Sequence, residues 1–435
     1  MKLAGRPRGP ARRPTGLDLA GVRRGRYSDA YFLNAAAVLR ALSGARAAFT
    51  GEPLALHGRL PRSARYAPGD AVVEMQFFAR RSPHLVAAGV AIAVDLLRDL
   101  SRRRRSAPLQ VRAVPEGSLT RPLEPVLVVR GRYRDFAHLE TPILGVLTRS
   151  SRIATNVYEA LIAARGKPVL FFPARFDLPQ TQEVDGYAYR VALAAYARRA
   201  GRRRPTPQVS TQAQAASWGG SGAGTTSHAY VLCFLGDTAE AMAAFCRHLP
   251  PRVPRAALVD TTNDCVGESL RTARRLFSEH LRHLRAGRRA RAQRFLLHAV
   301  RADTSQDLRD RSVPPSPDPR MARGVTPVLV RRIREALDRA PRELDLPERW
   351  RRLAERYFRS IRIVATGGFD AERIAFFERH RAPVDVYGVG SAFLRGPVTD
   401  FTADVVRVRI GRRFRTVAKA GRGARRGPLL RRVEL

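Results

Sequence analysis

Short apolar runs alternate with stretches of helical spacing through the later part of the chain, and this rhythm constrains the fold more than any other feature. The apolar runs lie at 169–177, 255–264, 295–305, 361–370 and 384–393. Strands that alternate with helices at this spacing indicate parallel β/α units. Polar residues or glycine close these runs, and ligands gather at the carboxyl ends of parallel strands. The sequence therefore predicts a polar site at one end of a β/α barrel.

Helices are expected around these strands, at 181–198, 229–248, 265–286, 327–340 and 371–380. The preceding part of the chain has a different pattern, in which helical spacing at 28–49, 85–97 and 136–165 is mixed with strand-like stretches at 70–80 and 123–133. Strand-like residues return after position 396. The first 24 residues are rich in Gly, Pro and Arg, and we expect a disordered basic extension there.

Length and composition limit the protein class. A chain of 435 residues is too long for one small core, so we expect two or three structural units. The longest apolar run, at 84–94, is shorter than a membrane helix, and the basic N-terminus lacks the apolar core of a secretory signal. Three dispersed cysteines without CxxC spacing fit neither a paired disulfide framework nor a structural zinc site. We expect a cytoplasmic protein without a membrane segment.

The formal net charge of +41 invites a nucleic-acid interpretation. Only Lys2, Lys167 and Lys419 are lysines, so nearly all of the 79 basic residues are arginines, and they are spread along the whole chain. No zinc-finger spacing, aromatic RNA-binding motif or basic zipper accompanies them. Charge alone suffices for nonspecific polyanion binding at low salt, and that remains a minor alternative. A compositional bias of the whole sequence explains the arginines better.

Two glycine-containing turns follow the last two predicted strands of the barrel. The first carries Thr366, Gly367 and Gly368, and the second carries Gly388, Gly390 and Ser391. Glycines let backbone N–H groups approach a phosphate closely, and the N-terminus of a following helix adds a favourable potential. A single turn of this kind is weak evidence. Two in succession match the usual phosphate position of a β/α barrel and favour phosphate binding over plain turns.

Charged residues close three other predicted strands. Asp260 and Asp303 end neighbouring strands and could hold Mg²⁺ or the diol of a ribose, whereas a helix cap is the simpler alternative. Arg301 precedes Asp303 by two residues, so both side chains share one face of the strand, where they could also form a structural ion pair. The planar fork of Arg175 suits a carboxylate ligand, although it is one of many arginines.

His228 lies in the stretch "GGSGAGTTSHAY" at 219–230. It can be a reactive group that the glycines expose, or a polar residue in a turn before a buried helix. A lone histidine in a turn is more often structural. No Ser–His–Asp order, HExxH site or Walker-type phosphate loop occurs elsewhere in the chain.

The order of these segments resembles that of nicotinate phosphoribosyltransferases. The resemblance is carried by "YSDAYFLNAA" at 27–36, by residues 115–160 with "LETPILGVLTRSSRIATN", and by the segments "FFPARFD", "GAGTTSHAYVLCF", "ALVDTTND", "VRADTS", "ATGGFDAERI" and "VYGVGSAFLRG". It covers roughly residues 27–420 in a single order, which is more specific than any one motif.

The fold that the resemblance implies is an N-terminal α/β domain, completed by the C-terminal segment and packed on an irregular parallel β/α barrel, as in type II phosphoribosyltransferases. The expected domains are 25–134 with 396–435, and the barrel at 135–395. The chain is expected to form a homodimer with shared active sites. The resemblance also implies phosphoribosyl transfer from phosphoribosyl pyrophosphate to nicotinate for NAD synthesis, coupled to ATP hydrolysis through a phosphorylated histidine, with Mg²⁺.

The resemblance also assigns roles to residues. His228 would be the phosphorylated histidine, and Asp303 would also be catalytic. Tyr31, supplied by the dimer partner, and Arg175 would bind nicotinate. Phosphoribosyl pyrophosphate would be bound by Arg152, Asp260, Arg301, Thr366, Gly367, Gly368, Gly388, Gly390 and Ser391. Asp260 and Asp303 would hold the metal directly or through water, and Thr141, Ser151 and Thr226 would line the pocket.

One departure from the family pattern is Gln306, where many relatives have glycine, which affects the local loop geometry. The alternatives are an enzyme that uses nicotinamide or a catalytically dead relative that binds polyanions. A quinolinate enzyme is disfavoured because such chains are shorter and lack the helix at 139–156 in this form.

Overall fold

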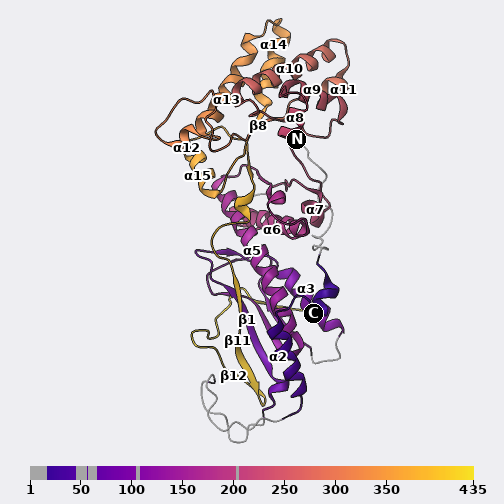
Figure 1. The fold of residues 1–435 in the computed structure, drawn as a ribbon, viewed down its shortest axis with the longest axis vertical. Helices are drawn as coiled ribbons and strands as arrows, with labels where there is room; N and C mark the ends of the chain where they lie inside the picture. Colours follow the sequence, from indigo (N-terminus) through magenta and orange to yellow (C-terminus); the bar gives the residue numbers. More distant parts are fainter. Residues whose placement is uncertain (1–16, 46–55, 57–65, 104–107, 202–204) are drawn as a thin grey trace. The chain divides into compact units, whose positions relative to one another are not determined.

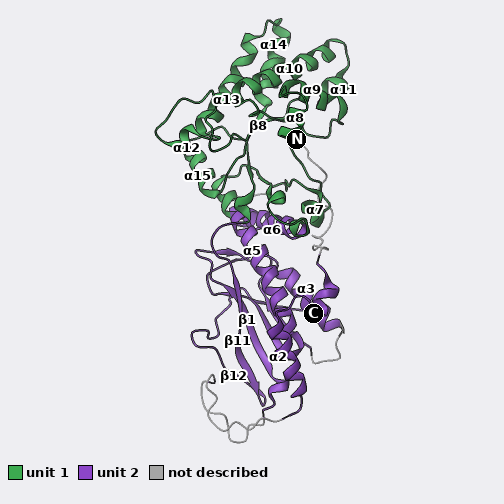
Figure 2. Ribbon diagram, viewed as in Figure 1, with its two compact units in different colours: residues 1–11, 159–182, 205–394 green, residues 12–158, 183–204, 395–435 purple. Residues whose placement is uncertain are grey.

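The computed structural model of the chain describes residues 17–45, 56, 66–103, 108–201 and 205–435 (Figure 1). Most of the predicted basic extension, and the end of the helix predicted at 28–49, lie outside these residues. Within the extension, Leu19–Arg23 form helix α1, whose N-terminus is capped by the Asp18 side chain. The chain divides into two compact units, coloured separately in Figure 2.

One unit combines described residues of 12–158, 183–204 and 395–435 around a six-stranded antiparallel sheet. The strand order is β12 (Arg413–Thr416), β11 (Phe401–Ile410), β1 (Val72–Ala79), β5 (Pro125–Arg132), β3 (Gln110–Ala113) and β13 (Arg431–Val433). β11 pairs with β1 and β13 pairs with β3, so the C-terminal segment completes the sheet. Its core includes Phe77, Leu97, Leu127 and Phe401. The predicted α/β domain with a C-terminal return is therefore confirmed as part of the fold.

The helix predicted at 85–97 begins later than expected. Leu85–Val86 form strand β2, paired with β4 (Leu119–Thr120), and helix α3 runs over Val90–Arg103. Gly89 adopts a φ of 80°, which suits glycine, and the Glu116 carboxylate accepts hydrogen bonds from the backbone N–H groups of Gly89 (2.7 Å) and Ala91 (2.6 Å). This cap fixes where the helix starts.

The other unit contains the parallel strands, in the order β6 (Val169–Phe171), β10 (Val386–Val389), β9 (Arg362–Ala365), β8 (Ala299–Ala302) and β7 (Ala256–Leu258). Irregular segments close the ring beyond its two edges. Phe171 N–H donates to Gln208 O, Ala223 N–H to Val209 O, and Thr226 N–H to Ala256 O. The prediction of an irregular parallel β/α barrel is therefore confirmed.

Helices connect these strands, namely α10 (Cys265–Arg285), α13 (Pro327–Arg339), α14 (Glu348–Ser360) and α15 (Ala371–Arg379). The single helix predicted at 229–248 is wrong. Two helices occur there, α8 (His228–Leu232) and α9 (Thr238–His248), because Leu235 and Gly236 have positive φ and the Asp237 side chain caps α9. α8 is therefore a short helix of its own, with His228 as its first residue. Among the residues that the structure describes, no helix is long and apolar enough to cross a bilayer.

Candidate active site

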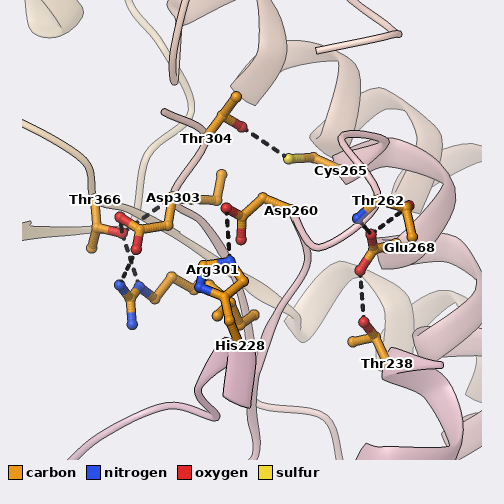
Figure 3. A network of polar contacts seen from close by, with 12 residues as sticks. His228, Thr238, Asp260, Thr262, Cys265, Glu268, Arg301, Asp303, Thr304 and Thr366 are labelled. Carbon is orange, nitrogen blue, oxygen red and sulfur yellow. Dashed lines mark hydrogen bonds and ion pairs between the residues drawn. The ribbon is translucent and has the colours of Figure 1, made fainter. Parts of the chain in front are cut away.

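Five of the predicted residues lie together at the carboxyl ends of β7, β8 and β9. Figure 3 shows the side chains of His228, Asp260, Arg301, Asp303 and Thr366 turned toward one another. Asp260 follows β7, Arg301 and Asp303 lie at the end of β8, and Thr366 follows β9. His228 comes from α8, which follows the irregular ring segment around Thr226. The strand-end pattern predicted this location.

His228 and Asp260 form a pair, with 3.1 Å between His228 Nε2 and Asp260 Oδ2. The imidazole is 46% exposed, whereas the Asp260 side chain is only 7% exposed. Burial raises the pKa of the Asp260 carboxyl, nearby His228 opposes this shift, and the charge of Asp303 adds to it. Asp260 Oδ1 is buried and has no hydrogen-bond partner among the residues that the structure describes. A polar atom in this state is costly unless a ligand or water binds it.

Arg301 is held by three neighbours. Its guanidinium donates to Thr366 Oγ1 (2.8 Å), to Thr225 Oγ1 (2.9 Å) and to Asp303 Oδ2 (2.5 Å). The Thr366 hydroxyl donates in turn to Asp303 Oδ1 (2.6 Å). Both oxygens of Asp303 are therefore engaged, in contrast to Asp260. The sequence left open whether Arg301 and Asp303 form an ion pair, and they do.

The turn after β9 has a backbone that requires glycine. Gly367 and Gly368 have φ values of 92° and 68°. A Cβ added to Gly368 would lie 1.9 Å from Gln306 Nε2. Arg373 holds the turn in place, because its guanidinium donates to Gly367 O (3.0 Å) within the turn and to Val325 O (2.8 Å) outside it. The backbone geometry of the predicted phosphate turn is therefore fixed by its surroundings.

The second glycine turn packs against the first. A Cβ on Gly388 would lie 2.4 Å from Thr366 Cγ2, and one on Gly390 would lie 2.7 Å from Phe176 Cε2. Ser391 then begins the 3₁₀-helix η7 (Ser391–Phe393). Larger side chains at either glycine would displace a neighbour in the site.

Two other predicted residues of this unit have more local contacts. Arg175 lies in the 3₁₀-helix η3 (Pro173–Phe176), is exposed, and places its guanidinium 5.2 Å from the Phe176 ring centroid. Thr226 is buried, and its hydroxyl accepts a hydrogen bond from the backbone N–H of Leu258 (3.0 Å). That hydroxyl therefore helps to close the barrel.

The remaining predicted residues belong to the unit with the antiparallel sheet. The Thr141 hydroxyl donates to Asp29 Oδ2 (2.9 Å), and Tyr31, in α2 (Ala30–Ala41), donates to the same oxygen (3.2 Å). Ser151 is fully buried and exchanges hydrogen bonds with the backbone of Ala88. Tyr31 and Thr141 thus share one carboxylate, whereas the Ser151 hydroxyl is occupied by backbone groups.

Arg152 lies apart from that group, with its Nη2 atom 3.4 Å from Asp400 Oδ1. Glu140, the first residue of α5 (Glu140–Ala163), is buried and accepts a hydrogen bond from the Tyr133 hydroxyl (3.3 Å). Burial raises the pKa of Glu140 to about 7, and the charges of Asp404 and Asp29 add to the shift. The sequence assigned Glu140 no role.

Sequence reasoning missed several residues of this network: Thr238, Thr262, Cys265, Glu268 and Thr304, which Figure 3 labels, and Thr225, which accepts from Arg301. Thr225 and Thr262 lie inside motifs that were noted, next to residues of higher chemical interest. Glu268 and Thr238 lie in helices that were expected to pack only. No local pattern marks them, because their contacts join segments that are distant in sequence.

Three comparisons with known proteins bear on this site. A family model described as quinolinate phosphoribosyl transferase, N-terminal domain, matches residues 61–151. A nicotinate phosphoribosyltransferase of Mycobacterium tuberculosis is 28% identical over 282 residues, 64% of this chain and 47% of that protein. The matched part thus spans about half the length of this curated relative.

Solved structures extend the likeness over the whole fold. A nicotinate-nucleotide pyrophosphorylase from Pyrococcus furiosus has a TM-score of 0.63 at 26% identity and covers 94% of this chain and 81% of its own. Human nicotinic acid phosphoribosyltransferase has a TM-score of 0.51 at 18% identity, over 79% of this chain and 71% of its own, which is a likeness of fold. The chain is therefore similar to phosphoribosyltransferases of nicotinate and quinolinate in sequence, and to both of these solved structures in fold.

Proposed function

We propose that this protein transfers phosphoribose from phosphoribosyl pyrophosphate to nicotinate, which yields nicotinate mononucleotide and pyrophosphate for NAD synthesis. One observation carries the proposal. His228 and Asp260 form a pair beside the Arg301–Asp303–Thr366 cluster and the two glycine turns, all at one end of a parallel barrel. This set joins a nucleophile, a cation, carboxylates and backbone donors within one site.

The chemistry needs these groups. When the nicotinate nitrogen attacks C1 of the ribose, the C1–O bond to pyrophosphate breaks, the ribose ring gains positive character and the leaving group gathers negative charge. The backbone N–H groups of Gly367 and Gly368 suit the 5′-phosphate, and Arg301 supplies positive charge. Asp303 would face the ribose while it holds Arg301 and Thr366 in place.

ATP coupling would run through His228. In the tautomer with its proton on Nε2, His228 would donate to Asp260 and Nδ1 would keep its lone pair. Nδ1 would attack the γ-phosphorus of ATP, the bond to the bridging oxygen would break, and ADP would leave. Asp260 would stabilise the positive charge that develops on the ring. A Cβ on Gly224, four residues before His228, would meet no atom within 4 Å, so this side of the segment leaves room for a phosphate.

The donor set also suits Mg²⁺, which takes one or two carboxylates and keeps several waters or substrate oxygens. The free Asp260 Oδ1 is the natural protein ligand, whereas Asp303 would contribute through water because both its oxygens are engaged. When bound, the ion would neutralise charge on the pyrophosphate group. Within the described ranges, no group of three or more His, Cys, Asp or Glu side chains is placed to hold a metal ion by itself. Substrate oxygens and water would therefore supply the other ligands.

The base would be recognised by Tyr31 and Arg175, through ring stacking and through the carboxylate. Tyr31 is 62% exposed on α2, where only Ala36 is fully buried and Val38 is 59% exposed. An apolar helix this exposed suits a partner surface. This supports a homodimer whose sites are shared, with Tyr31 supplied by the partner chain.

Pyrophosphate release from purified protein tests the proposal. Nicotinate, nicotinamide and quinolinate should be compared with phosphoribosyl pyrophosphate and Mg²⁺, with and without ATP. Quinolinate is included because the matching family model is described by that base. The highest kcat/KM is expected with nicotinate, and ATP should increase it. Preference for another base would correct the substrate, and salt-sensitive RNA binding without pyrophosphate release would favour the dead polyanion binder.

His228→Ala tests the coupling step. ATP hydrolysis stimulated by the other substrates should be lost, while some phosphoribosyl transfer remains because the groups around the ribose and phosphates are intact. Mass spectrometry after incubation with ATP should find a phosphoryl group on His228 in the wild type. Substrate-stimulated ATP hydrolysis that survives the substitution would disprove the phosphohistidine assignment.

A further inference from the structure

We propose that Glu268 is a positioning residue for the His228–Asp260 pair. The proposal rests on the function proposed above and adds a residue to it. Glu268 lies in the first turn of α10, its exposure is 1%, and it touches neither His228 nor Asp260 by a hydrogen bond. It acts instead on the two segments that carry them.

One carboxylate oxygen holds the turn after β7. Glu268 Oε1 accepts hydrogen bonds from the backbone N–H and the hydroxyl of Thr262, both at 2.6 Å. Thr262 is two residues beyond Asp260, and the turn is closed by Asn263 N–H, which donates to Asp260 O. Asn263 has a φ of 57°, in the left-handed region that Asn adopts more readily than most non-glycine residues. Glu268 therefore fixes the turn that presents Asp260.

The other oxygen holds the segment after His228. Glu268 Oε2 accepts from the Thr238 hydroxyl at 2.6 Å. Thr238 is the first residue of α9, and only residues 233–237 separate α9 from α8, the short helix that begins with His228. One buried carboxylate thus joins the Asp260 turn to the His228 segment, as Figure 3 shows.

The burial and contacts of Glu268 are not explained by capping of its own helix, α10. Asp264 is the N-cap of α10, and its side chain accepts from Gly267 N–H at 2.9 Å. The Glu268 carboxylate points instead to Thr262 and Thr238, from two other segments. A buried carboxylate with three donors is well satisfied, whereas its removal leaves buried donors without partners. Both segments would then gain freedom, and the 3.1 Å contact between His228 and Asp260 would loosen.

The test is a double-mutant cycle. Glu268→Ala should lower the kcat of the ATP-stimulated reaction at least tenfold, with KM for nicotinate changed less than threefold. Because Glu268 acts through Asp260, the same substitution in an Asp260→Asn background should cost less than threefold further. Glu268→Gln should stay within threefold of wild type, because its amide oxygen can accept from Thr262 and its amide nitrogen can donate to Thr238.

A second measurement does not depend on activity. Diethyl pyrocarbonate modifies free imidazole nitrogens, and peptide mass spectrometry gives the rate at His228. The rate should rise at least threefold in Glu268→Ala and stay at the wild-type level in Glu74→Ala. Glu74 is a control because it is also buried, but in the antiparallel sheet, with Arg407 Nη1 at 3.3 Å.

Three outcomes would overturn the proposal. Glu268→Ala could lower kcat equally in the wild-type and Asp260→Asn backgrounds, Glu74→Ala could raise the modification rate at His228 as much as Glu268→Ala does, or Glu268→Ala could leave that rate unchanged. If the wild type has no activity with nicotinate, the proposed function fails, and the modification rates still decide whether Glu268 positions the pair. Should Glu268→Ala fail to fold, Thr238→Val and Thr262→Val each remove one hydroxyl contact to Glu268. Both should then lower kcat and raise the modification rate at His228.

Discussion

Two aspartates of similar position in the sequence have different surroundings in the site. Asp260 and Asp303 each follow a barrel strand, so their place at a strand end predicts the same role for both, binding of a metal or of the ribose. Asp260 keeps one oxygen without a partner, whereas both oxygens of Asp303 are held by Arg301 and Thr366. Asp260 is therefore the carboxylate available to a ligand or metal, and Asp303 is the one that organises its neighbours. Such a division depends on side chains from other strands, which no local pattern reveals.

Glu140 predicts a pH dependence of stability. Its pKa, about 7, lies above its usual 4.5, chiefly because of burial. A raised carboxyl pKa contributes stability that is complete below pH 4.5 and is lost as the pH rises through 7. Glu140→Gln stays neutral, so it should be more stable than wild type at pH 8.5, by about 3 kcal/mol, and equal to it at pH 4.5.

Thermal unfolding of both proteins across this range measures the effect. Glu335→Gln, an exposed position on α13, is the matched control and should follow the wild type. Parallel curves for Glu140→Gln and wild type at all pH values would show that the carboxyl does not change its ionisation between pH 4.5 and 8.5.

At the scale of elements, the turn between β9 and α15 offers a test of the proposed phosphate site through its backbone geometry. Gly368→Ala places a Cβ against Gln306 Nε2 at a φ of 68°. We expect KM for phosphoribosyl pyrophosphate to rise about tenfold, because the N–H groups of the turn would shift from the 5′-phosphate, a loss of about 1.4 kcal/mol in binding.

Gly287→Ala is the control for this prediction. Gly287 has a similar φ of 70°, but a Cβ there would meet no atom within 4 Å. Both substitutions carry the left-handed strain of about 1 kcal/mol, and only Gly368→Ala should change KM. An unchanged KM in folded Gly368→Ala would remove this turn from the phosphate site. Steady-state kinetics with varied phosphoribosyl pyrophosphate provides the measurement.

Periodicity predicted most barrel elements, and its failures have local causes. All five parallel strands fell inside the predicted runs, although each is only three or four residues long. The apolar run from Val231 to Leu235 hid the break between α8 and α9, because hydrophobic spacing carries no information about the positive φ of Leu235. The break matters for function, since it lets Thr238 begin a new helix that Glu268 can hold.

For the whole molecule, the arginines show why charge alone was a poor guide. Arg255 is fully buried, and its guanidinium donates to the carbonyls of Leu249, Pro250 and Arg294. Arg373 supports the glycine turn, and Arg301 serves the site. Similar side chains thus have structural and chemical tasks, and only the fold separates them. The order of motifs along the chain was the better predictor, because it reflects how the barrel brings strand ends together.

The proposed homodimer with shared sites gives the last prediction. Light scattering should give twice the chain mass of 48.3 kDa. Tyr31→Ala and His228→Ala homodimers should each lack efficient ATP-stimulated transfer at low nicotinate. If Tyr31 of one chain serves the His228 site of the other, a mixed dimer has one site with both residues intact and one with both replaced. It should then recover about half of the wild-type rate.

The mixed dimer can be isolated with a different affinity tag on each chain. If each chain completed its own site, every site in the mixed dimer would carry one replaced residue, and no rate would be recovered. Recovery depends on the pairing of chains and vanishes if the two variants are purified separately and assayed together without exchange. A mixed dimer that only averages the two parents would therefore place Tyr31 and His228 in sites formed by a single chain.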